Sequence, residues 1–500
     1  MDIQPEILSS RLEDILQSIP LFGPELWLSF GFLILILSGL IAGKRHRVGL
    51  IVCVIILLGN FAFLFQQWSE VQMREMGLFL NMLDLRAMSV FLKFVFTITA
   101  LLVVVFSALS GFYNQVKEIR YEFFLLLIAS LIGLNLMVMS ANLLMLYISL
   151  ELVSISSYVL VSILLDLKGS EAGVKYFIYG VFASALMLYG ISLIYGFSGS
   201  MYFSEEMFSS LASANGWLGY TALGLFLCGL FFKVSIFPFH IWVPDVYEGA
   251  PLPVTAWLSI APKVAGIIVL GIVFSFVVPA YQVEWKTTLA ILAMITMAVG
   301  NFAALRQTNV KRLLAYSSIA HAGFLLAGIS TFKALGFSSV VFYSCVYVLM
   351  NSGAFFMVEI LSAATGSEDV SKYKGLGYKL PFAGLIFVVL MVALTGLPPT
   401  GGFTAKLLLF TSIWDAYRQE GQGVMLFLLV FGLLNTMLAL YYYLKIPYIM
   451  YFKKAEEEMS KKAGAGSMAF MVLVTLPVLM LFFKPDWLMN YIEKINLYFR

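Results

Sequence analysis

Long apolar stretches separated by short polar segments occupy almost the whole chain. A helix needs about 20 mainly apolar residues to cross a membrane, and about fourteen stretches have this length. The predicted spans are residues 24–43, 48–67, 88–112, 121–139, 141–165, 173–197, 216–237, 252–275, 287–305, 312–331, 335–362, 381–413, 424–451 and 467–484. Each stretch is continuously apolar rather than alternating, which excludes a membrane β-barrel. The pattern therefore predicts an all-α polytopic membrane protein.

Proline and glycine residues interrupt the seventh and twelfth of these spans. Pro238 and Pro244 follow Lys233 at the end of the seventh, and the sequence LPPTGG at 397–402 precedes Lys406 in the twelfth. Such breaks leave backbone polar groups that lipid cannot satisfy, so they belong beside protein or water. Matching breaks in two halves, with the order of break and lysine reversed, predict inverted repeats and an ion path. Two packing kinks are the alternative.

The composition agrees with a membrane protein, since 61% of the 500 residues are hydrophobic and only 12% are charged. Little of the chain is left for a soluble domain. Cys53, Cys228 and Cys345 fall in different apolar segments, without the paired spacing of a zinc or iron–sulfur site. The sequence also lacks the glycine pattern of a dinucleotide or phosphate loop. We therefore expect no metal and no cofactor on this chain.

The charges in the loops predict an orientation. Acidic residues precede the first span, unlike a cationic leader, so we expect no cleaved signal peptide. An N-terminus outside the cell puts most cations in cytoplasmic loops, as the positive-inside rule requires, and the net charge of +3 reflects this topology rather than a nucleic-acid patch. The cytoplasmic cations would be Lys44, Arg45, Arg47, Lys117, Arg120, Lys168, Arg306, Lys311, Arg312, Lys372, Lys374, Lys379, Lys453, Lys454, Lys461 and Lys462. The external ones would be Arg74, Lys286, Lys333 and Arg418.

Four ionisable residues, Glu151, Lys233, Lys263 and Lys406, lie within long apolar segments. A charge at this depth costs roughly 2.5 to 3.5 kcal/mol on insertion scales, so several in one chain predict proton or ion transport. We expect Lys233 to be the partner of Glu151, because an ammonium group offsets the effect of burial on a carboxylate. A static buried ion pair is the alternative.

Lys263 and His321 are candidate members of a proton relay. Burial favours the neutral form of lysine, and histidine titrates near neutral pH. Ser259 lies one turn from Lys263, and Ser317 and Ser318 lie one turn from His321, where they can hold water or the ammonium group. A histidine satisfied in the core is the alternative for His321.

Lys175 and His240 are weaker candidates. Lys175 starts the sixth span and is either a proton site or an interfacial anchor. His240 lies in the loop of the broken seventh helix, where we expect it to hold the loop by hydrogen bonding, with a direct proton role as the alternative; a single histidine without other ligands is a poor metal site. Asp245 and Glu248 are expected at the cytoplasmic mouth, as proton collectors, partner contacts or solvated loop residues. Lower candidates are Lys93 and Glu359.

Four segments of the sequence carry a resemblance to a known family. They are KVSIFPFHIWVPDVYEGAP at 233–251, PVTAWLSIAPK at 253–263, KRLLAYSSIAHAG at 311–323 and TGLPPTGGFTAK at 395–406. On these segments the chain resembles the subunit N family of bacterial proton-translocating NADH:quinone oxidoreductase, complex I, one of the antiporter-like membrane subunits. The resemblance spans nearly the full length, and fourteen spans fit the bacterial form.

The resemblance implies a division of the chain and of the chemistry. Residues 1–120 would hold helices 1–3, 121–280 the first antiporter-like repeat, 281–452 the inverted second repeat, and 453–500 a cytoplasmic loop and helix 14. NADH, FMN, iron–sulfur clusters and quinone would bind partner subunits, and this translocase subunit would only move protons across the bacterial inner membrane. Its neighbours would be other antiporter-like and small membrane subunits. Lys406 matches the family's terminal proton donor towards the external side.

Three other functions are compatible with some of these features. A stand-alone cation/proton antiporter subunit and the membrane subunit of a related hydrogenase would both use similar channel chemistry. The PDVYEG and APK segments, at 244–249 and 261–263, favour the subunit N family over the antiporter. A purely structural scaffold would explain the hydrophobicity but not the buried charges.

Overall fold

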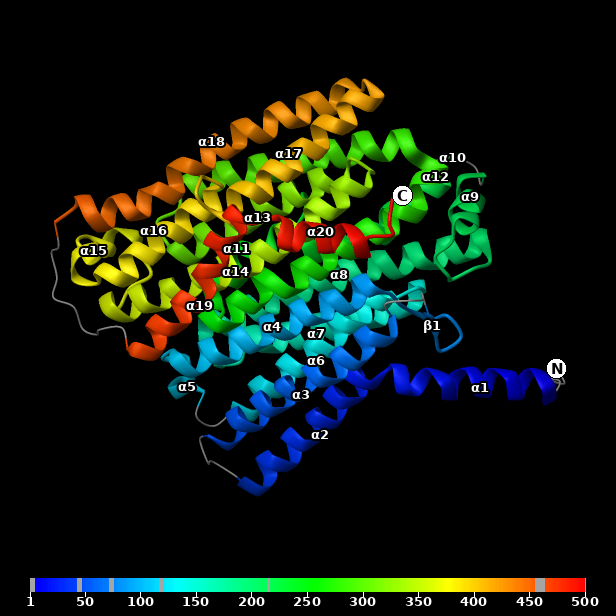
Figure 1. Cartoon of the computed structure of the whole chain (residues 1–500), viewed down its shortest axis with the longest axis horizontal. Helices are drawn as coiled ribbons and strands as arrows, with labels where there is room; N and C mark the ends of the chain where they lie inside the picture. The colour runs from blue at the N-terminus through cyan, green and yellow to red at the C-terminus, as the bar shows by residue number, and fades with distance from the viewer. Residues whose placement is uncertain are drawn as a thin grey trace.

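The computed structural model describes residues 5–42, 47–71, 76–116, 120–213, 216–454 and 464–499. Its long helices lie side by side in one bundle, with both chain ends at the same end of it, and the first helix extends away from the rest (Figure 1). The helices are α1 (Pro5–Leu21), α2 (Gly23–Ala42), α3 (Val48–Val71), α4 (Ala87–Leu109), α5 (Phe112–Gln115), α6 (Arg120–Met139), α7 (Leu143–Val161), α8 (Leu167–Ser198), α9 (Glu205–Ser213), α10 (Gly216–Val234), α11 (Trp242–Gly249), α12 (Leu252–Leu305), α13 (Val310–Ile329), α14 (Ala334–Thr365), η1 (Val370–Tyr373), α15 (Leu376–Lys379), α16 (Pro381–Thr395), α17 (Gly401–Glu420), α18 (Gly423–Phe452), α19 (Ala465–Phe483) and α20 (Asp486–Ile495).

The membrane-spanning pattern predicted from the sequence is confirmed. Within the described residues, thirteen helical segments are long and apolar enough to cross a membrane. Each corresponds to one predicted span, and the remaining span, 381–413, is divided between α16 and α17. The fold is therefore an all-α membrane bundle with the seventh and twelfth spans broken.

One helix, α12, contains two membrane spans, Leu252–Pro279 and Trp285–Leu305. The ring centroids of Phe274 and Trp285 lie 5.6 Å apart. In a straight helix, eleven residues would separate two positions by about 16 Å. The helix therefore turns back on itself between the two spans, with no intervening loop.

Backbone groups at the break after α10 find hydrogen-bond partners within the protein. The backbone amide of Phe237 donates to Thr296 Oγ1 of α12 at 3.1 Å. The indole Nε1 of Trp242, at the start of α11, donates to the carbonyl of Phe232 at 3.1 Å. Polar backbone groups freed by a break must find such partners inside a membrane.

The break between α16 and α17 depends on glycine. Gly396 ends α16 with a φ of +85°, which side chains rarely tolerate. A Cβ atom on Gly402 would overlap the carbonyl oxygen of Ala393, so α17 can start this close to α16 only without a side chain there. The short gap brings Lys406 to the end of α16.

The shorter elements were not predicted from the sequence. They include α1, α9, α11, α20 and an antiparallel hairpin of β1 (Met76–Leu78) and β2 (Leu83–Leu85). Each is too short or too polar to read as a membrane span. Six loop cations used to predict the orientation lie outside the described residues, namely Lys44, Arg45, Arg74, Lys117, Lys461 and Lys462.

Candidate functional site

Lys233 lies in the last turn of α10, just before the break, and is 1% exposed. Its Nζ donates to Ser154 Oγ of α7 at 3.1 Å. Glu151 lies one turn before Ser154 on α7 and accepts a hydrogen bond from Ser184 of α8. The expected pairing is therefore indirect: the ammonium contacts a serine beside the glutamate, although the carboxylate still acts on Lys233 electrostatically.

Lys263, on α12, contacts both α13 and α11. It is 3% exposed, and its Nζ donates to Ser318 Oγ of α13 at 2.7 Å. The ammonium lies 5.4 Å from the ring centroid of Tyr247 on α11. Ser259, expected to support Lys263, instead contacts the hydroxyl of Tyr347 at 3.3 Å. The partner serine thus comes from α13 rather than from the same helix.

His321 is held between two tyrosines. Its Nδ1 lies 2.8 Å from the hydroxyl of Tyr343 on α14, and its Nε2 lies 3.0 Å from the hydroxyl of Tyr443 on α18. Tyr443 also contacts Ser317. Both imidazole nitrogens therefore have hydroxyl partners that can give or accept a proton. The sequence analysis missed both tyrosines, because nothing distinguishes them among the 25 in the chain.

Lys406 lies in the second turn of α17 and is 4% exposed. Its Nζ donates to the carbonyl of Thr395 at 2.7 Å and lies 4.7 Å from the ring centroid of Phe324. Phe324 is one turn from His321 on α13, and both Lys263 and Lys406 act on His321 electrostatically. The fold thus brings Lys263, His321 and Lys406 into one buried series.

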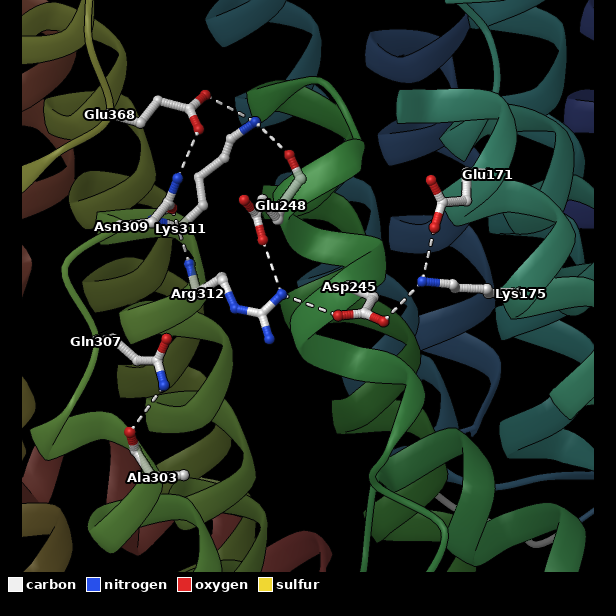
Figure 2. A network of polar contacts seen from close by, with 10 residues as sticks. All are labelled: Glu171, Lys175, Asp245, Glu248, Ala303, Gln307, Asn309, Lys311, Arg312 and Glu368. Atoms are coloured by element: carbon white, nitrogen blue, oxygen red, sulfur yellow. Dashed lines mark hydrogen bonds and ion pairs between the residues drawn. The ribbon is translucent and has the colours of Figure 1, made fainter. Parts of the chain in front are cut away.

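Ion pairs connect α8, α11 and α13 (Figure 2). Lys175 of α8 contacts Glu171 at 2.8 Å and Asp245 of α11 at 3.1 Å. Arg312 of α13 contacts Asp245 at 2.9 Å and Glu248 at 2.7 Å. Partial burial opposes ionisation of Asp245, but the hydrogen bonds from Arg312 and Lys175 outweigh it and hold the pKa of Asp245 below its ordinary value. Asp245 and Glu248 are therefore ion-paired, and their side chains stay 40% and 34% exposed.

The remaining candidates differ in their distance from the buried series, and His240 lies close enough to Lys263 for the two to interact electrostatically. His240 stacks on Phe237 with ring centroids 5.6 Å apart, and its ring interacts with the backbone of Pro238 in the same loop. Glu359 accepts a hydrogen bond from the amide of Gly111 at 3.0 Å. Lys93 pairs with a glutamate of α2. Among the described residues, no group of three or more histidine, cysteine or acidic side chains could hold a metal ion.

Comparisons with known proteins identify relatives along most of the chain. A family model described as "NADH:quinone oxidoreductase/Mrp antiporter, TM" matches residues 140–438. NADH-quinone oxidoreductase subunit N of Chlorobium chlorochromatii is 36% identical over 470 residues, which cover 91% of this chain and 90% of that protein. NADH-quinone oxidoreductase subunit N 2 of Chloroherpeton thalassium is 38% identical over 488 residues, covering 93% and 92%.

Solved structures extend this similarity to the fold. A chain of respiratory complex I from Thermus thermophilus matches with a TM-score of 0.75 and 31% identity, covering 93% of this chain and 98% of that chain. A chain of the archaeal membrane-bound sulfane sulfur reductase gives 0.83 at 21% identity, covering 95% and 96%, and shares the fold. The broken spans, the buried lysines and the subunit N relatives agree, and the chain belongs to the subunit N family of the NADH-quinone oxidoreductases.

Proposed function

We propose that this chain is the proton-translocating subunit N of a membrane-bound NADH:quinone oxidoreductase, and that Glu151, Lys233, Lys263, His321 and Lys406 carry the proton path. The observation that carries the proposal is the buried series of titratable groups, each lysine beside a broken span or joined to a neighbouring helix by a serine. A scaffold without transport has no use for such charges, because each is costly in a membrane.

The coupling is electrostatic. A charge change in a neighbouring subunit alters the separation of Glu151 and Lys233, which changes the proton affinity of Lys233. At an effective dielectric constant of about 20, moving the two groups from the present serine-separated arrangement into direct contact at 4 Å, or apart again, changes the energy by up to roughly 4 kcal/mol. That is enough to reverse proton occupancy. The proton then passes through Lys263 and His321 to Lys406, and leaves on the external side.

The same proposal covers the setting of the chain. Residues 121–280 and 281–452 form two inverted repeats, after helices 1–3 in 1–120 and before the last helix in 453–500. The chain lies in the inner membrane of a bacterium with its N-terminus outside, beside other antiporter-like and small membrane subunits. NADH, FMN, iron–sulfur clusters and quinone bind other subunits of the complex, so the translocase reaction is completed by the complex as a whole. Lys175 and His240 stay secondary candidates.

A stand-alone cation/proton antiporter and the membrane subunit of another electron-donor complex remain competing functions. A chain of the Mrp complex from Dietzia has the same fold with a TM-score of 0.81, but at 18% identity. The higher identity of the subunit N relatives supports the NADH-linked function.

Replacing Lys233 by alanine tests this function in the assembled complex. We expect quinone-linked NADH oxidation and proton pumping in vesicles to fall together by at least about tenfold, because a buried proton carrier has been removed. Lys484→Ala, at an exposed position after α19, is the matched control and should retain both activities. Normal pumping by Lys233→Ala would contradict the proton path, and a large complex with activity towards a different electron donor would change the assigned partner enzyme.

A further inference from the structure

A cavity of about 640 Å³ lies at the end of the bundle that carries the cationic loops, between the chain segments before and after α12. Its wall includes the exposed residues Asp166 and Lys168 and reaches inwards to Lys311. Glu359, Glu368 and Asp369 also line it. The cavity thus joins an exposed, charged surface to the first turn of α13, the helix that carries Ser318 and His321.

Lys311 was expected to be an ordinary loop cation, but the structure buries it. The side chain is only 8% exposed. Its Nζ contacts Glu368 Oε1 at 2.8 Å and donates to the carbonyls of Glu248 and Ala250 at 3.0 and 3.1 Å (Figure 2). These carbonyls lie at the end of α11, where helix carbonyls have no partner within the helix. Lys311 therefore closes the inner end of the cavity against the broken seventh span.

Further along α13 from Lys311, the side chains come into contact with Lys263. Lys311 and Ser318 are seven residues apart on α13, which puts them on one face about 10 Å apart. Ser318 accepts the hydrogen bond of Lys263. Tyr247, next to Glu248 on α11, packs its ring against the Lys263 ammonium, and its buried hydroxyl lies beside Ser318 and Ser259 without a well-aligned hydrogen bond to either. A buried polar group of this kind is where an internal water is expected.

We propose that Lys311 takes up protons from this cavity and passes them inwards to Lys263. This inference rests on the proposed function and adds an uptake site to it. The Lys311 ammonium gives one proton to the hydroxyl and water path beside Tyr247, and the neutral amine then takes one proton from water in the cavity. No electron moves, and Glu368 stabilises the charged state between transfers.

Arginine at position 311 separates this role from a purely structural one. An arginine keeps the positive charge and can hold Glu368 and the two carbonyls, but it does not release its proton. In the assembled complex in vesicles, we expect Lys311→Arg to lower pumping and quinone-linked turnover by at least about tenfold at neutral pH. The loss should shrink as the pH on the cavity side falls, because at a high proton concentration the arrival of protons at the inner site no longer limits the rate. Lys168→Arg, the same change at the exposed part of the cavity, should behave like the wild type.

Three outcomes would overturn the proposal. Wild-type pumping by Lys311→Arg would make Lys311 only a cap for α11. A loss of equal size at every pH would indicate distortion of the site rather than blocked uptake. An equal loss in Lys168→Arg would show that the effect is not specific to the inner position. Lys233→Ala in the same preparation keeps the tests apart: if it still pumps, the proposed function fails, whereas an active Lys311→Arg beside an inactive Lys233→Ala removes only the uptake site.

Discussion

Lys93 and Glu25 form an ion pair inside the membrane region, away from the proposed proton path. Their side chains are 0% and 1% exposed, and Lys93 Nζ lies 2.8 Å from Glu25 Oε1. The same ammonium donates to Gln67 Oε1 of α3 at 3.0 Å, and Gln67 donates to the carbonyl of Leu21. Three N-terminal helices, α2, α3 and α4, are therefore tied together by one buried charge pair.

Removing one member of this pair should cost more than removing both. Lys93→Met leaves a buried carboxylate unpaired, which we expect to destabilise the chain by about 3–5 kcal/mol. The double variant Lys93→Met with Glu25→Gln should recover much of that loss. Thermal unfolding of the purified complex measures both, with Lys484→Met as the exposed control. Equal losses in the single and double variants would show that the two charges do not depend on each other.

The break between α16 and α17 requires the backbone at Gly402 to lie directly against the backbone of α16. A side chain at Gly402 would overlap the backbone of α16, and forcing an extra carbon into a packed site typically costs about 1–3 kcal/mol. We expect Gly402→Ala to lower the thermal stability of the complex and to disturb Lys406, one turn further along. Gly423→Ala is the matched control, because a Cβ there meets no atom within 4 Å. Equal stability of the two variants would show that α17 shifts freely.

Sequence patterns predict these long elements well but not the contacts between them. Continuous apolar runs identify membrane spans because a helix that crosses lipid must be apolar over its whole length. The LPPTGG sequence identifies the break because proline and glycine change the backbone locally. The amphipathic α11 is too short to give a clear pattern. Tyr343 and Tyr443 lie 22 and 122 positions from His321 along the sequence, so no local pattern identifies them as its partners. Lys311 looks like a loop cation until the cavity around it is known.

The orientation of the whole molecule can be tested by labelling its two ends. If the cationic end faces the cytoplasm, as the positive-inside rule requires, Lys168→Cys should react with a membrane-impermeant maleimide only in inverted vesicles. Glu205→Cys, on α9 at the opposite end, should react only in intact cells with a permeable outer barrier. The unsubstituted chain, with its three native cysteines, controls for background labelling. Reversed labelling would place the proposed uptake cavity on the external side.

The continuous fold-back of α12 determines where the molecule has room to move. Lys263, in the first span of α12, and the second span belong to one continuous helix. No flexible linker between the two spans could therefore lengthen if they moved relative to each other. Changes in the spacing between Lys263 and Lys406 must arise elsewhere. The non-helical gaps at 235–241 and 396–400, beside Lys233 and Lys406, are two places where the backbone can bend without losing helix hydrogen bonds. Motion that accompanies each transferred proton is therefore expected within the membrane, next to the lysines themselves.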